Sequence, residues 1–237
     1  KDLIQDQLYV GSYLLLSFLS FMPGVFLFFF KNVENVQEDS LKEGNIRNLK
    51  SIVLQPRFLQ AITAAAFAYA VMSFLMTATP LSMHVMENMS LKETGLVLQF
   101  HVVAMFLPSL ITGNLIKKYG HSAIIYGGVL FFFITVLLSL FEQTYLNYML
   151  SLIFLGLGWN FLFISGTSLV VLTYNKEEKF KVQGINDLIV FSTMALASLS
   201  AGILLNSIGW KMMNIICIPF LILIIFVSFV ADKKSVS

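Results

Sequence analysis

Cysteine and charge are both scarce in this chain of 237 residues. Cys217 is the only cysteine and lies in an apolar run, so neither a disulfide framework nor a cysteine metal cluster can form within the chain. Charged residues make up 12% of the sequence, whereas about a quarter is usual in soluble domains. Hydrophobic residues make up 57%, and the mean hydropathy is +0.82. This composition predicts an integral membrane protein.

The sequence also lacks the motifs of several enzyme classes. It contains no H-E-x-x-H zinc motif, no phosphate-binding P-loop and no G-x-S-x-G nucleophile motif. We therefore expect no enzymatic activity and no site for a metal or cofactor. The net charge of +2 is too small to favour nucleic acid as a partner.

Seven apolar segments are long enough to cross a bilayer as helices, which takes about 20 residues. Helices are expected because backbone groups in lipid must be satisfied within the segment, and because runs such as LFFFITVLLSL do not alternate as barrel strands do. The predicted spans are 9–30, 58–83, 96–116, 122–141, 146–174, 183–207 and 212–231.

The cationic residues support this division. Twelve of the 15 Lys and Arg residues fall in connections on one side of the predicted membrane. The positive-inside rule places that side, together with the C-terminus, in the cytoplasm. We therefore expect a multi-pass protein of the plasma or inner membrane, surrounded by the lipid bilayer.

One long polar connection divides the chain. It covers residues 31–57 and includes Pro56, where we expect the next helix to begin. The predicted organisation is a single transmembrane helix in 1–30, a cytoplasmic linker in 31–57 and a six-helix bundle in 58–237. Segment 9–30 lacks the flanks of a signal peptide. Because the first residue is not Met, we expect the chain to be a piece of a longer protein.

Three stretches carry a family likeness. GNLIKKYGH (113–121) follows most of the pattern G-x-L-x-D-[RK]-x-G-[RK], and its matching residues are Gly113, Leu115, Lys118 and Gly120. Lys117 stands where the pattern has an acid, and His121 replaces the final basic residue. LQPRFLQAI (54–62) and the small-residue segment 183–210 are the other two stretches. With the order of the spans, these motifs resemble helices six to twelve of a major facilitator superfamily transporter.

The resemblance implies an all-α membrane fold: the C-terminal six-helix half of such a transporter plus one preceding helix. It implies a secondary transporter that moves a small solute by alternating access, with an N-terminal half as its missing partner and protons as a candidate coupling ion. A seven-helix accessory or interaction protein that does not transport is the alternative.

Polar and aromatic residues inside the spans are the candidates for a substrate cavity. These candidates are Thr77, Gln99, His101, Trp159, Asn160, Thr167 and Thr193. For each, packing between helices is the alternative, because small and polar side chains also join helices in lipid. A histidine near pH 7 can stay neutral and still take up a proton, so His101 is also a candidate coupling group.

The cytoplasmic start of the sixth span holds the candidate gate. Asp187 is the only acid inside a predicted span, and Asn186 precedes it. We predict that both residues form part of a cytoplasmic gate or a coupling site. The alternative is that Asp187 stabilises the helix N-terminus and pairs with Lys118 or Lys181. Pro108 predicts a bend in the third span.

Overall fold

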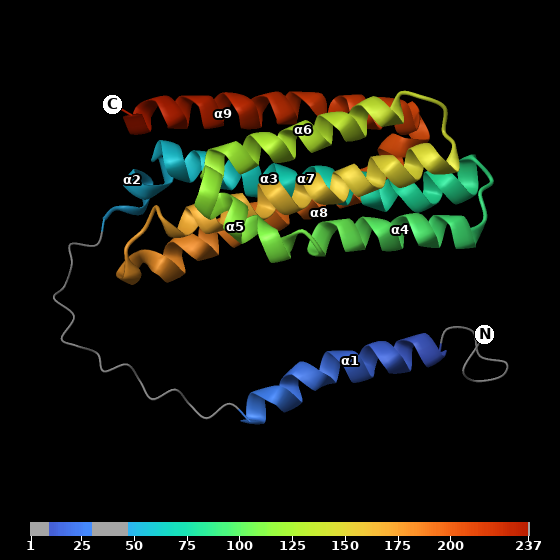
Figure 1. The fold of residues 1–237 in the computed structure, drawn as a ribbon, viewed down its shortest axis with the longest axis horizontal. Helices are drawn as coiled ribbons and strands as arrows, with labels where there is room; N and C mark the ends of the chain where they lie inside the picture. Colours follow the sequence, from blue (N-terminus) through green and yellow to red (C-terminus); the bar gives the residue numbers. More distant parts are fainter. Residues whose placement is uncertain (1–9, 30–46, 237) are drawn as a thin grey trace. The chain divides into compact units, whose positions relative to one another are not determined.

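Two compact units make up the computed structural model, Lys1–Asn45 and Ile46–Ser237, and the structure describes residues 10–29 and 47–236 (Figure 1). In the first unit, helix α1 (Val10–Phe29) has 20 residues, long enough for one membrane span. Its apolar side chains are exposed on all sides, which is typical of a helix surrounded by lipid or partner helices. Residues 31–46 of the predicted linker lie outside the described residues.

The second unit is a bundle of helices, with no strand in its described part. Residues 46–57 of the predicted linker belong to this unit. They include α2, and α3 begins at Pro56 as expected, where the absent N–H of proline costs no hydrogen bond. The elements are α2 (Leu49–Val53), α3 (Pro56–Pro80), the π-helix η1 (Leu81–Met86), α4 (Leu91–Phe106), α5 (Ser109–Tyr119), α6 (His121–Ser139), α7 (Tyr145–Val171), the 3₁₀ turn η2 (Lys176–Glu178), α8 (Lys179–Ile216) and α9 (Ile218–Val236).

The predicted third span is two helices in the structure. It begins at Leu91, where Ser90 and Glu93 form a capping box. It breaks between α4 and α5 at Leu107 and Pro108, which confirms the expected bend: proline has no N–H for the helical ladder. The span therefore reaches Tyr119, beyond the predicted end at 116.

The last two predicted spans lie in one apolar, mostly helical stretch from Lys176 to Lys234, 59 residues long. A straight helix of that length would measure about 90 Å, far more than a bilayer core. Gly209 reverses the chain with a positive φ of 75° and ψ of 170°, a conformation that favours glycine. The run is therefore a hairpin of two spans, as the sequence predicts.

Helix α7 packs closely on three neighbours through its glycines. A Cβ on Gly156 would lie 2.7 Å from the carbonyl oxygen of His101 in α4. A Cβ on Gly166 would lie 2.7 Å from the carbonyl oxygen of Ala61 in α3, and one on Gly158 would collide with a ring of α6. Only glycine permits these approaches, so α7 packs closely on α3, α4 and α6.

Hydrogen bonds identify the two ends of the bundle. At the first end, which we call the Arg57 end, Arg57 of α3 and Ser122 of α6 both donate to Asp232 of α9, at 2.8 and 2.6 Å. At the opposite end, Ser82 of η1 and Tyr148 of α7 share a hydrogen bond of 2.6 Å. Successive spans therefore alternate in direction, and Figure 1 shows α2 and the end of α9 at the same end of the bundle.

Candidate functional site

Five aromatic rings from four helices contact one another, and we call them the aromatic cluster. Trp159 and Phe163 of α7 are one helical turn apart and stack with their planes 14° apart and their centroids at 4.9 Å. Tyr69 of α3 meets both rings edge-on, at 5.3 and 4.8 Å. Phe191 of α8 lies 6.0 Å from Tyr69, and Phe106 of α4 lies 5.9 Å from Trp159.

The aromatic cluster has a buried floor and exposed outer rings. Trp159 is 4% exposed, whereas Phe106 and Phe191 are 58% and 50% exposed. Within the described part of the chain, the indole Nε1–H of Trp159 has no hydrogen-bond acceptor. Exposed ring faces can stack on a flat molecule, and a buried unpaired donor is available to an acceptor on a ligand. Of these five residues, the sequence had pointed only to Trp159.

Asn160 joins α7 to the break between α4 and α5. Its Nδ2 donates to the Met105 carbonyl at 2.6 Å and to Ser109 Oγ at 2.7 Å. Its Oδ1 accepts from the Thr112 hydroxyl at 2.6 Å, and that hydroxyl also lies 2.8 Å from the Pro108 carbonyl. Both amide hydrogens are therefore used by protein partners, the arrangement expected if Asn160 serves helix packing.

His101 lies fully buried in the contact between α4 and α7. Its Nδ1 is 2.7 Å from the Leu152 carbonyl, so this nitrogen carries the hydrogen and donates to that oxygen. Its Nε2 has no partner among the described residues. The ring thus connects two neighbouring helices and keeps one nitrogen that could take up a proton.

The remaining cavity candidates are spread over the bundle. Thr77 is exposed and its hydroxyl lies 3.1 Å from Ser198 of α8, while Gln99 is exposed on α4. The Thr167 hydroxyl donates to the Phe163 carbonyl of its own helix at 2.8 Å. Thr193 does the same to Ile189 at 2.7 Å. The structure therefore does not gather these four side chains into one site.

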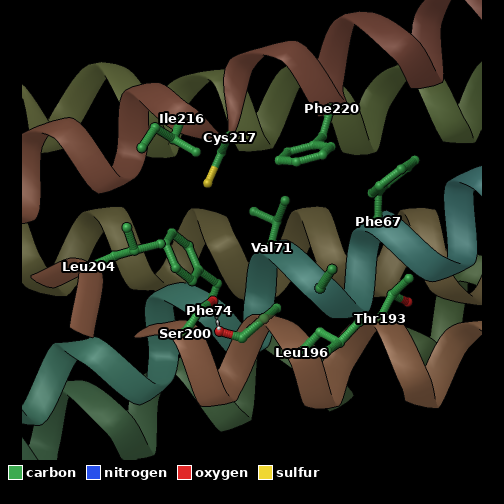
Figure 2. A pocket seen from close by; sticks show the side chains of 12 residues that line it. Phe67, Val71, Phe74, Thr193, Leu196, Ser200, Leu204, Ile216, Cys217 and Phe220 are labelled. Carbon is green, nitrogen blue, oxygen red and sulfur yellow. Dashed lines mark hydrogen bonds between the residues drawn. The ribbon is translucent and has the colours of Figure 1, made fainter. Parts of the chain in front are cut away.

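Thr193 belongs instead to an apolar pocket between α3, α8 and α9, with a volume of about 300 Å³. Figure 2 shows the side chains around it, with the sulfur of Cys217, the residue between α8 and α9, pointing toward α3. The lining residues are Phe67, Ala70, Val71, Phe74, Thr193, Leu196, Ala197, Ser200, Leu204, Ile216, Cys217 and Phe220.

The candidate gate residues occupy different environments. Asn186 is buried, and its Nδ2 donates to Asp187 Oδ1 at 3.0 Å, whereas Asp187 is exposed. Within the described ranges Asp187 forms no ion pair with Lys118 or Lys181. An exposed carboxylate of this kind is free to pair with groups outside the chain.

The GNLIKKYGH motif is almost entirely helical. Gly113, Leu115 and Lys118 lie within α5, and Gly120, with φ of 82° and ψ of 161°, is the one residue between α5 and α6. The expected loop of residues 117–121 is thus a single-residue turn, because the helix continues to Tyr119. Lys118 Nζ lies over the Tyr119 ring, 4.9 Å from its centroid.

The sequence did not indicate the polar network at the Arg57 end. Asp232 Oδ1 accepts from Arg57 Nη1 and Ser122, and its Oδ2 accepts from the Tyr126 hydroxyl at 3.2 Å. Arg57 also donates to Gln60 at 2.7 Å. A single carboxylate thereby holds the ends of α3, α6 and α9 together.

A second ion pair fastens α2 to the connection between α7 and α8. Arg47 donates through Nε and Nη2 to the two carboxylate oxygens of Glu178, at 3.0 and 2.7 Å. Backbone N–H groups of Arg47 and Asn175 add bonds of 3.0 and 2.8 Å. These hydrogen bonds, led by the one from Arg47, lower the pKa of Glu178 to about 2, and the Glu178 carboxylate raises the pKa of Arg47. The described residues contain no group of three or more potential metal ligands.

Comparison with known proteins gives consistent matches. A family model described as Major Facilitator Superfamily matches residues 8–189 and 61–237. The chain is 35% identical over 225 residues to the riboflavin transporter RfnT of Brucella anthropi, which covers 95% of this chain and 56% of RfnT. It is 26% identical over 217 residues to the uncharacterized MFS-type transporter YdeG of Bacillus subtilis, which covers 87% of this chain and 50% of YdeG. The chain therefore spans about half the length of these relatives.

Proposed function

Since this chain belongs to the major facilitator superfamily, we propose that it forms part of a secondary transporter that moves a small solute across a membrane by alternating access. The six-helix bundle would supply one wall of the transport pathway, and an N-terminal half would supply the other. On the positive-inside count, the Arg57 end and the C-terminus face the cytoplasm of a plasma or inner membrane.

The aromatic cluster indicates which class of substrate the protein binds. Its two exposed rings come from different helices: Phe106 lies beside the buried Trp159, and Phe191 lies beside Tyr69. Such an arrangement suits a flat aromatic solute, which gains from stacked or edge-on ring contacts about 0.5–1.5 kcal/mol per pair beyond simple burial. The name of RfnT supports the same class, since riboflavin contains three fused planar rings. We therefore propose riboflavin or a related flat heterocycle as the substrate.

Each member of the cluster would have a separate part in binding. Phe106 and Phe191 would stack on the ligand ring, and Tyr69 would hold the floor through its edge-on contacts with Trp159 and Phe163. The unpaired indole N–H of Trp159 would donate to a ring carbonyl or nitrogen. A buried donor of this kind discriminates strongly against ligands that lack the acceptor.

Uptake into vesicles tests this proposal. The whole gene product is reconstituted in proteoliposomes, and uptake of labelled riboflavin is compared between wild type and the Phe106→Ala/Phe191→Ala double variant. The apparent affinity should fall about tenfold or more, the loss expected from two ring contacts. Phe180→Ala removes a ring of α8 that is 85% exposed and outside the cluster, and it should leave uptake unchanged.

The possible results separate the alternatives. Uptake by the double variant that equals wild type would refute the role of the cluster. Transport of a different solute, with none of riboflavin, would refute only the substrate. Failure of the wild type to move any solute in a broad screen would favour the non-transporting accessory protein.

We also propose that His101 or Asp187 couples transport to the movement of protons. His101 has a buried Nε2 without a described partner, and Asp187 is an exposed carboxylate at the start of a span. A coupling role predicts that His101→Ala or Asp187→Asn alters the dependence of uptake on pH. If both variants kept the wild-type rate and pH profile, neither residue would serve coupling.

A further inference from the structure

The apolar pocket described above results from the way α8 and α9 separate. Each of these helices packs on α3, while the two make few contacts with each other. Small residues face the space between them, namely Ala70, Ala197 and Ser200. Helix α8 ends at Ile216, and Cys217 is the one residue before α9, whose second residue, Pro219, cannot donate to the helical ladder. The result is a groove whose floor is α3 and whose walls are α8 and α9.

The polar side chains in the wall offer a ligand no free hydrogen-bond donor. The hydroxyls of Thr193 and Ser200 donate to carbonyls of their own helix at 2.7 and 2.9 Å. The Cys217 thiol donates to the Met213 carbonyl at 3.4 Å. A solute rich in hydrogen-bond acceptors would lose its bonds to water here and gain no donor in return. Apart from these two hydroxyl oxygens, which can still accept a hydrogen bond, the lining is apolar, so it favours an apolar occupant.

The depth of the pocket indicates what that occupant is. The lining residues of α8 that precede the turn at Gly209 run from Thr193 to Leu204, more than three turns from Lys179 and more than one turn from Gly209. At the rim, Leu196 is 68% exposed, and Ile216 and Phe220 are 38% and 39% exposed. A groove at this level of a spanning helix opens at the depth of the hydrocarbon core. Lipid tails are the flexible apolar molecules at this depth, and a space of about 300 Å³ is too small for another transmembrane helix.

We propose that this pocket binds one hydrocarbon chain of a bilayer lipid. A volume of about 300 Å³ would hold a stretch of roughly ten methylene groups, if each fills about the volume of a water molecule in the liquid. The site differs from the aromatic cluster, which carries an unpaired indole donor and belongs to the proposed transport pathway. The lipid site therefore does not depend on the proposed function.

Photocrosslinking in a bilayer tests this assignment. The whole gene product is placed in phosphatidylcholine–phosphatidylethanolamine vesicles whose lipids carry a diazirine within one acyl chain. After illumination, lipid adducts are mapped by peptide mass spectrometry. We expect adducts concentrated on 67–74, 193–204 and 216–220. An even spread over all exposed apolar residues would overturn the proposal, as would lipid adducts that avoid these three segments.

Two variants and a matched control sharpen the test. Ala197→Phe should fill the pocket and reduce these adducts at least tenfold. Ala195→Phe adds the same ring at an exposed position of α8 outside the pocket, and it should leave the adducts unchanged. If Ala197→Phe does not fold, Ser200→Leu fills the same space with a smaller side chain. Undiminished adducts in a folded pocket-filling variant would refute the site. The readout requires no transport, so it stands even if the proposed substrate is wrong.

Discussion

The contacts of α7 and those of α8 show two different ways in which helices meet in this bundle. Around α7, glycines bring backbones close together, and polar side chains reach across: Thr112 to Asn160, and Ser151 to the Thr135 carbonyl at 3.2 Å. Along α8, where the pocket separates the helices, Thr193 and Ser200 bond to their own helix. Beside the pocket, the hydroxyls therefore bond within α8, whereas Ser198 of the same helix, outside the pocket, shares a hydrogen bond of 3.1 Å with Thr77 of α3.

The largest expected effect comes from widening a close contact of α7. Gly166→Val places a Cβ 2.7 Å from the Ala61 carbonyl oxygen, so α3 and α7 must move apart. We expect a loss of about 3 kcal/mol of stability, the upper part of the range for overpacked cores. Unfolding by sodium dodecyl sulphate titration measures it. Gly184→Val, at a helical position with nothing within 4 Å, should change stability by less than about 0.5 kcal/mol. Equal losses of stability in the two variants would show that the close contact between α3 and α7 is not the cause.

The next effect comes from removing the amide that crosses between helices. Asn160→Leu leaves the Met105 carbonyl and two hydroxyl groups without this partner at the break between α4 and α5. A loss of about 1–3 kcal/mol follows from unsatisfied buried groups. The same unfolding titration applies, with Asn114→Leu, an exposed position of α5, as control. A variant as stable as wild type would show that Asn160 is not needed for packing.

Outside the spans, the contact between Arg47 and Glu178 depends on charge and should therefore respond to pH. The pKa of Glu178 is lowered to about 2 in the folded state, below the ordinary value of 4.5. Its stabilising contribution is complete above the unfolded pKa and is lost as the pH falls through the folded one. Protection of residues 47–55 from hydrogen exchange should thus be constant from pH 7 to 5 and decline between about pH 4.5 and 2. Glu178→Gln should remove that pH dependence; a wild-type profile in this variant would exclude the ion pair as its cause.

The smallest effect on stability is expected from removing a hydroxyl that donates only to a carbonyl of its own helix. Thr193→Val loses a bond within α8 and should change stability by less than about 0.5 kcal/mol. Thr112→Val loses a partner on α7 and should cost about 1 kcal/mol. The difference in stability loss between these two matched substitutions measures how much more a hydrogen bond between helices contributes than one within a helix. A greater loss from Thr193→Val than from Thr112→Val would reverse it.

Much of the fold could be predicted because the bilayer sets a minimum length of apolar helix for every span. Apolar runs and the positions of Lys and Arg identified seven spans, and Pro56 and Pro108 marked a start and a bend correctly. The structure adds contacts that no local pattern contains. Arg57 and Asp232 are 175 residues apart, and Arg47 and Glu178 are 131 apart. Nothing in the spacing of either pair distinguishes it from other charged residues.

The candidate site could be predicted only in part. Polarity singled out Trp159 and Asn160, because an indole or amide among apolar residues needs a partner. It could not single out Phe106 or Phe191 from the 23 phenylalanines of the chain, because their proximity depends on how α4 and α8 pack. The hydroxyl candidates failed to converge because the helical ladder itself accepts a hydrogen bond from Thr167 and Thr193.

The short helix α5 has a mechanical consequence. It is joined to α6 by Gly120 alone and to α4 through Leu107 and Pro108, and between these joints it is a continuous helix of 11 residues. A helix of about 16 Å between two joints moves as a rigid unit, so any bending is confined to Gly120 and to Leu107–Pro108. If α6 tilts, α5 must therefore rotate about the joint at Pro108. There Asn160 donates hydrogen bonds to the Met105 carbonyl and to Ser109. A movement of α6 relative to α4 would therefore strain the hydrogen bonds of a single side chain, Asn160.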